Sequence, residues 1–105
     1  MNEELYRKAY RTWGIGAQMD MVIEEAAELI QAIRKSDRNG ILREQENLVE
    51  EMVDVEIMIE QMKVILNDLL HSYPPLYKNK REHKLERLAD RLGPDTETEG
   101  ENAKV

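Results

Sequence analysis

The chain has 105 residues, 35% of them charged and only 5% aromatic, which is typical of one small domain with an aliphatic core. Its formal charge of −7 argues against binding of duplex DNA or RNA, because a surface that follows phosphates needs an excess of Lys and Arg. The absence of cysteine excludes disulfides and thiolate chemistry. No apolar run approaches about 18 residues and the first residues do not resemble a signal peptide, so we expect a cytoplasmic protein with no membrane partner.

Apolar residues recur at helical spacing in four segments, and the three prolines lie outside them, so we predict an all-α fold. The predicted helices cover roughly residues 2–13, 17–35, 41–71 and 79–92. A turn cluster at 36–40 separates the second helix from the third, and Pro74 and Pro75 end the third. From Gly93 to Val105 there is no periodicity and almost nothing to bury. We therefore expect one helical domain over 1–92 and a disordered acidic tail over 93–105.

The long third helix is apolar on two sides. Its main seam steps alternately by four and three residues, as in a coiled coil, through Leu48, Met52, Val55, Ile59, Met62, Leu66 and Leu69. A second set, Val53, Ile57 and Val64, lies on the far side. A helix that is apolar on two faces needs two layers of neighbours, and another copy of the chain is the simplest source. We predict a homodimer or a dimer of dimers that completes a helical bundle.

Two acidic motifs, at 23–29 and 49–55, share the pattern apolar, Glu, Glu, two residues, acid, apolar. At 100° per residue, with Val22 and Leu48 as zero, the acids fall at about −60° (Glu25 and Glu51) and about −120° (Glu28 and Asp54). Glu24 and Glu50 fall at about 200°, away from this flank. A short turn makes the two long helices antiparallel neighbours. We therefore expect the four carboxylates at −60° and −120° to converge at the edge of the apolar stripes that the two helices bury.

Carboxylates at an apolar border are costly to ionise unless a cation compensates them. Oxygen ligands with no cysteine and no suitably placed histidine favour Mg²⁺, with Mn²⁺ as a substitute, over Zn²⁺. The alternative is a solvated acidic face, which is the usual meaning of a single such motif in a chain with 22 acidic residues. Two copies in one register favour a metal site more strongly, but from the pattern alone both interpretations stay open.

The paired motifs resemble those of the MazG-like all-α nucleoside triphosphate pyrophosphohydrolases, a superfamily that includes dimeric dUTPases and dCTP pyrophosphatases. The resemblance covers about residues 13–92 and includes Trp13, Gly14 and Gln18, both acidic motifs and the basic last segment. It implies the four metal ligands that the helical wheel selects, Glu25, Glu28, Glu51 and Asp54. It also implies that Glu24 orients or deprotonates the attacking water, although the wheel turns this side chain away from the ligands.

The resemblance further implies the reaction, in which a (deoxy)nucleoside triphosphate and water give the monophosphate and pyrophosphate. The substrate-binding residues would be Asn79, Lys80, Lys84 and Arg87, which would meet the phosphates, together with Gln18 and Trp13. The indole of Trp13, the only Trp in the chain, offers a surface for stacking on a base. For the basic segment the alternative is a solvated face, and for Trp13 it is a core anchor. For the whole chain the alternative is a non-enzymatic helical oligomer that acts as a nucleotide sensor or a protein-interaction module.

Overall fold

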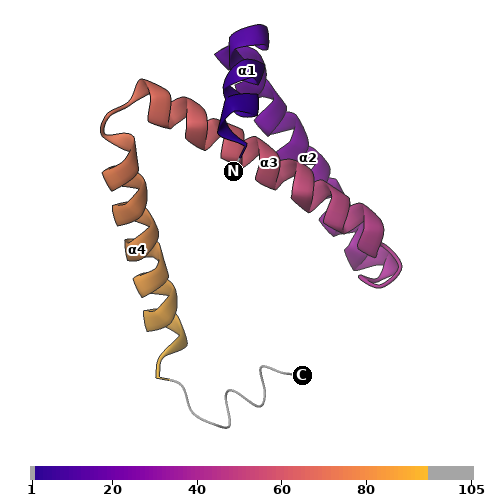
Figure 1. The fold of residues 1–105 in the computed structure, drawn as a ribbon. Coiled ribbons are helices and arrows are strands. Elements are labelled where there is room, and N and C mark those ends of the chain that lie inside the picture. The colour runs from indigo at the N-terminus through magenta and orange to yellow at the C-terminus, as the bar shows by residue number, and fades with distance from the viewer. Residues whose placement is uncertain (1, 95–105) are drawn as a thin grey trace. The chain divides into compact units, whose positions relative to one another are not determined.

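The computed structural model describes residues 2–94, and this part of the chain contains four helices and no strands, which confirms the all-α prediction (Figure 1). The helices are α1 (Glu3–Trp13), α2 (Ile15–Asn39), α3 (Gln45–Leu69) and α4 (Tyr73–Leu92). They form two units: α1, α2 and α3 belong to the first, which ends at Leu70, and α4 belongs to the second. The tail predicted to be disordered lies, from residue 95 onward, outside the described residues.

Two glycines set the boundaries of α2. Gly14 and Gly40 have φ angles of 93° and 96°, which favour glycine, and their backbone N–H groups donate to the carbonyls of Tyr10 and Ser36. The prediction of a turn at 36–39 is wrong, because α2 continues to Asn39. Ser36 is buried there, and its hydroxyl donates to the carbonyl of Ile33 at 2.7 Å, which satisfies this polar group inside the helix.

The prediction that the two prolines separate the third helix from the fourth is only half right. Helix α3 ends at Leu69, but α4 already begins at Tyr73 and holds Pro74 and Pro75 in its first turn. Proline is tolerated at this place because the N–H groups of the first turn have no partner within the helix. Helix α4 therefore starts six residues earlier than its apolar periodicity indicates.

The first unit is built around the pair α2 and α3, with α1 packed against both. The segment at 40–44 joins α2 to α3, and residues from the first half of α2 line a cavity together with Met58 and Gln61 from α3 (Figure 1). The buried apolar side chains are Tyr6, Ala32, Met58, Val64 and Ile65. Ala32 on α2 and Ile65 on α3 are only 1% exposed. None of these five belongs to the predicted seam of the third helix.

Polar contacts hold α1 against α3. The Tyr6 hydroxyl donates to Glu60 at 2.6 Å. Arg7 donates to both carboxylate oxygens of Asp68, at 3.0 and 3.2 Å, and the Tyr10 hydroxyl donates to the same carboxylate at 2.7 Å. The hydrogen bonds from Arg7 and Tyr10 hold the pKa of Asp68 below its usual value.

We predict that Tyr6→Phe lowers the free energy of unfolding by about 1–3 kcal/mol, because a hydrogen bond to a charged acceptor is lost from a buried ring. Glu60→Gln keeps an acceptor oxygen and should cost less. Urea unfolding followed by circular dichroism measures both changes. If Tyr6→Phe is as stable as the original chain, this hydrogen bond does not hold α1 in place.

Candidate metal centre

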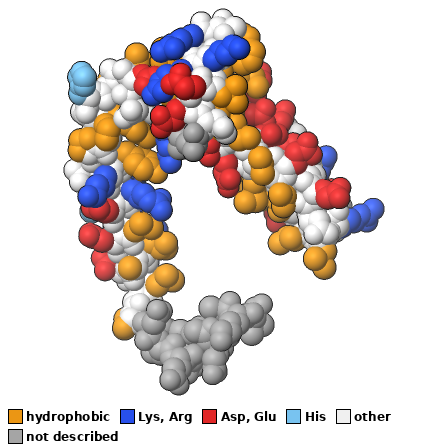
Figure 2. Space-filling model, in the orientation of Figure 1, with side chains coloured by type: hydrophobic (Ala, Val, Ile, Leu, Met, Phe, Trp, Pro, Cys, Tyr) orange, Lys and Arg blue, Asp and Glu red, His pale blue; other side chains and the backbone are white. Residues whose placement is uncertain are grey.

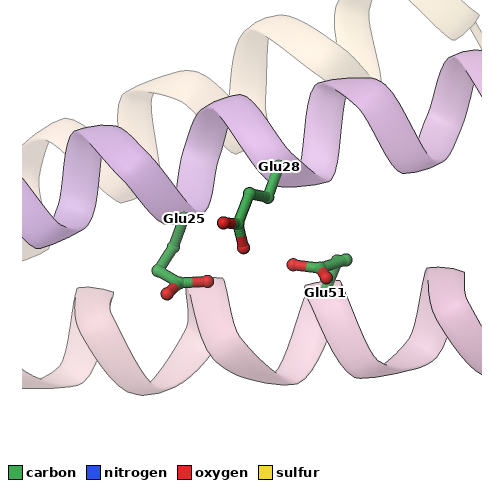
Figure 3. Close-up of side chains that lie close together, drawn as sticks. All are labelled: Glu25, Glu28 and Glu51. Atoms are coloured by element: carbon green, nitrogen blue, oxygen red, sulfur yellow. The ribbon is translucent and has the colours of Figure 1, made fainter.

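Three of the predicted acids come together between α2 and α3. Glu25 and Glu28 project from α2 and Glu51 projects from α3, so that the carboxylates point into the space between the two helices (Figure 3). One oxygen from each carboxylate lies within 4.8 Å of the others. The spacing of three between Glu25 and Glu28 places both on one side of α2, and the chain reversal at 40–44 sets Glu51 opposite them.

The environment of these carboxylates opposes their ionisation. Glu25 and Glu51 are half-buried, and each has one oxygen, Oε2, that is shielded from solvent and accepts no hydrogen bond within the described part of the chain. Burial raises the pKa of both groups, and the negative charges of Glu28 and Asp54 raise it further. Glu28 itself is exposed, so the group of three opens to solvent on one side.

The other two acids assigned to the site stand apart from this group of three. Asp54 is half-buried one turn beyond Glu51, close enough for its charge to act on Glu25 and Glu51, but its oxygens lie outside the group. Glu24 is exposed and also lies outside it. The group of three therefore leaves out Glu24, which the wheel placed on another flank, and Asp54 acts on Glu25 and Glu51 through its charge.

A divalent cation fits this arrangement. Two shielded oxygens without hydrogen-bond donors are the kind of acceptor that a metal ion satisfies, and the third carboxylate is open to solvent. A cation bound here would also cancel the repulsion that raises the two pKa values. Because all the donor atoms are carboxylate oxygens, the group suits a hard cation.

A cavity of about 650 Å³ adjoins the acids along the same pair of helices. It is lined by Trp13, Ala17, Gln18, Asp20, Met21, Met58 and Gln61. Met21 lies four residues before Glu25, so one helical turn separates the cavity from the acids. Trp13, which lines this cavity, is 67% exposed.

Besides Asp20, two glutamines supply the polar part of the cavity wall. Gln18 is only 4% exposed, and Gln61 has a shielded Oε1 that accepts no hydrogen bond within residues 2–94, while its Nε2 lies 3.6 Å from the Met58 sulfur. Gln18 was among the predicted site residues, but the sequence analysis missed Gln61. Its helical position was the available signal, since Gln61 follows Asp54 by seven residues and therefore faces almost the same way.

The basic residues assigned to the phosphates all lie on α4, where Lys and Arg side chains are visible in Figure 2. Lys80 and Lys84, with Tyr77, Arg81 and Leu85, surround a shallow groove on this helix. Asn79 and Arg87 are exposed on the same helix. The structure thus collects the predicted site residues into three groups: the acids, the cavity with Trp13 and Gln18, and the cations of α4.

Comparisons of the chain with models of protein families, with curated proteins and with solved structures returned no match. Among the described residues, no helix is both long enough and apolar enough to cross a membrane.

We predict that, without metal, the thermal midpoint falls as the pH rises from about 4.5 toward neutrality. In the unfolded chain Glu25 and Glu51 lose their protons near the ordinary glutamate pKa of 4.5, whereas in the folded chain burial and the neighbouring carboxylates raise both pKa values. The folded state therefore binds more protons across this window, and its stability decreases with increasing pH.

Differential scanning calorimetry in EDTA measures this slope. Glu25→Gln should flatten it and raise the midpoint at pH 7, whereas Glu56→Gln, which removes an exposed charge on α3 outside the group, should do neither. Mg²⁺ should raise the midpoint of the unmodified chain at pH 7. Equal slopes for the two variants would mean that the acids are not coupled as described.

Proposed function

We propose that this protein hydrolyses a (deoxy)nucleoside triphosphate to the monophosphate and pyrophosphate in a Mg²⁺-dependent reaction. The observation that carries the proposal is the convergence of Glu25, Glu28 and Glu51, with two shielded and unpartnered oxygens, one helical turn from a cavity with an exposed indole. The resemblance of the two acidic motifs to those of the MazG-like pyrophosphohydrolases supports the same reaction. In this proposal α2 and α3 form an antiparallel pair in a helical bundle that homo-oligomerisation completes.

The proposed metal ligands are Glu25, Glu28 and Glu51, with Asp54 completing the set from the next turn of α3. Bound Mg²⁺ would neutralise charge on the phosphate oxygens and make the α-phosphorus more electrophilic. Mn²⁺, with the same preference for oxygen ligands, would substitute for it. The protein's own contribution is to hold the carboxylates in one place before the substrate arrives, so that little reorganisation is needed during the reaction.

The reaction forms a bond from the water oxygen to the α-phosphorus and breaks the bond from that phosphorus to the oxygen bridging to the β-phosphate. The electron pair of the broken bond leaves with pyrophosphate, and the water loses a proton to a carboxylate. The resemblance assigns this proton to Glu24, next to Glu25 on α2. On α4, Asn79, Lys80, Lys84 and Arg87 are proposed to bind the β- and γ-phosphates as they become the leaving group.

The cavity beside the acids is proposed to hold the base. The exposed face of Trp13 offers a stacking surface, and the apolar walls at Met21 and Met58 suit a planar ring. Gln18 and Gln61 would supply hydrogen bonds to the edge of that ring, which gives the shielded amide oxygen of Gln61 a partner in the complex.

Glu28→Gln should lower turnover by roughly 10²–10³-fold or more, because it removes a negative ligand that the transition state requires. The matched control is Glu56→Gln, which makes the same chemical change at an exposed site on α3 and should leave turnover unchanged. The assay supplies a panel of NTPs and dNTPs with Mg²⁺ and scores pyrophosphate separately from orthophosphate. Wild-type turnover by Glu28→Gln would contradict the site assignment.

The same panel distinguishes the alternatives. Nucleotide-dependent thermal stabilisation without pyrophosphate release would indicate a nucleotide sensor and contradict the enzymatic proposal. A chain that neither releases pyrophosphate nor gains stability from any nucleotide would indicate a protein-interaction module.

Gln61→Leu should raise KM for the preferred nucleotide by about tenfold with little change in kcat, because it removes one hydrogen bond to the base worth roughly 1.4 kcal/mol. The nucleotide-free variant should be at least as stable as the original chain, since the substitution removes an unpartnered buried amide oxygen. Asn67→Leu, at an exposed site on α3, is the control and should leave KM unchanged. An unchanged KM for Gln61→Leu would place the base elsewhere.

A further inference from the structure

The polar wall of the cavity beside the acids is rich in hydrogen-bond acceptors. The carboxylate of Asp20, which can only accept, lies at this wall. Gln61 adds the shielded Oε1 that accepts no hydrogen bond within residues 2–94. None of the described residues that line the cavity is Lys, Arg or His. A ligand that fills the cavity must therefore bring hydrogen-bond donors of its own.

Helix α2 places Gln18 and Asp20 at opposite edges of this wall. At 100° per residue the two side chains are about 160° apart, and Ala17 and Met21 fall between them. Gln18 is only 4% exposed, whereas Asp20 is exposed, so the amide lies on the inner side and the carboxylate at the mouth. A planar ring that rests on Ala17 and Met21 would have the amide at one end of its edge and the carboxylate at the other.

We propose that this cavity selects guanine among the common bases, and that Asp20 determines the selection. The inference rests on the proposed function, in which the cavity holds the base of a nucleotide. Guanine carries two adjacent donors, the ring N1–H and the amino group on C2, and one carboxylate can accept from both. The carbonyl oxygen at the other end of the same edge is an acceptor, which the amide group of Gln18 can meet.

The other common bases match this wall less well. Uracil and thymine have a single ring N–H between two carbonyl oxygens, and cytosine and adenine have an amino group beside an unprotonated ring nitrogen. Each of them turns a lone pair toward Asp20 when its donor is aligned with the carboxylate. Such a pair of acceptors loses its hydrogen bonds to water and forms none in return. Asp20 therefore selects by rejection as well as by attraction.

The charge of Asp20 also determines which end of the nucleotide lies at the cavity. Asp20 is one helical turn before Glu24 on α2 and repels phosphate groups. The acids that could hold a metal ion begin at Glu25, so the triphosphate is attracted there and repelled from the mouth of the cavity. A base without charge is the part of the nucleotide that suits the mouth.

The fluorescence of Trp13 tests this proposal, because Trp13 is the only Trp of the chain and lines the cavity. The full chain in Mg²⁺ is titrated with the 5′-monophosphates of guanosine, inosine and uridine, which carry the same phosphate. The guanosine and inosine compounds differ only in the amino group on C2. We expect the guanosine compound to bind about tenfold or more tightly than the other two, because they lose a hydrogen bond to a charged acceptor.

Asp20→Asn keeps the size of the side chain and replaces the carboxylate with an amide that donates as well as accepts. It should bring the three dissociation constants to within about threefold of one another. Asp37→Asn makes the same change at an exposed position near the end of α2, outside the cavity, and should keep the preference for guanine. The comparison of guanosine with inosine uses the unmodified chain, so it tests the proposal even if Asp20→Asn fails to fold.

Equal dissociation constants for the guanosine and inosine compounds would overturn the proposal. A preference for guanine that survives in folded Asp20→Asn, or no quenching by the guanosine compound at millimolar concentration, would overturn it as well. These outcomes are separate from the proposed reaction, since no monophosphate is hydrolysed in the titration. Release of pyrophosphate without any preference for guanine would contradict the selection alone, and a preference without release of pyrophosphate would contradict the reaction alone.

Discussion

The repulsion among the carboxylates between α2 and α3 is the constraint around which the first unit is arranged. Glu25 and Glu51 each place a shielded oxygen where no N–H or O–H group of residues 2–94 donates to it, and Glu28 and Asp54 add negative charge nearby. Such a group costs stability unless protons or a cation neutralise it. The same two helices carry Ala32 and Ile65, the two most deeply buried residues described, so the acids lie on the elements that also form the core.

The packing of α1 extends this group of acids into a site with a cavity. Arg7, Tyr6 and Tyr10 tie α1 to the second half of α3, and this attachment places Trp13 at the end of α1 beside Gln18 and Gln61. The acids and the cavity then follow one another along the same helices, one turn apart. A ligand with a planar ring at one end and a charged group at the other matches that order.

The helices and the acids could be predicted from the sequence because both depend on local periodicity. A spacing of three residues places Glu25 and Glu28 on one side of α2. The short segment between α2 and α3 is then enough to bring Glu28 close to Glu51. The end of α2 and the start of α4 were misplaced, because Ser36 satisfies its hydroxyl within the helix and prolines fit a first turn. The exposure of Trp13 and the role of Gln61 in the cavity depend on how α1 crosses α3, and periodicity contains no information about that crossing.

The seam of α3 shows that a periodic pattern does not by itself identify the neighbour of a helix. Its coiled-coil spacing is present in the sequence, but the buried residues of α3 are Met58, Val64 and Ile65, and the seam stays half-exposed. The periodicity reports which residues avoid water and does not report which helix covers them. With α1 and α2 packed against α3, the apolar residues of the seam remain half-exposed, so the contacts within the first unit do not account for the whole of its periodicity.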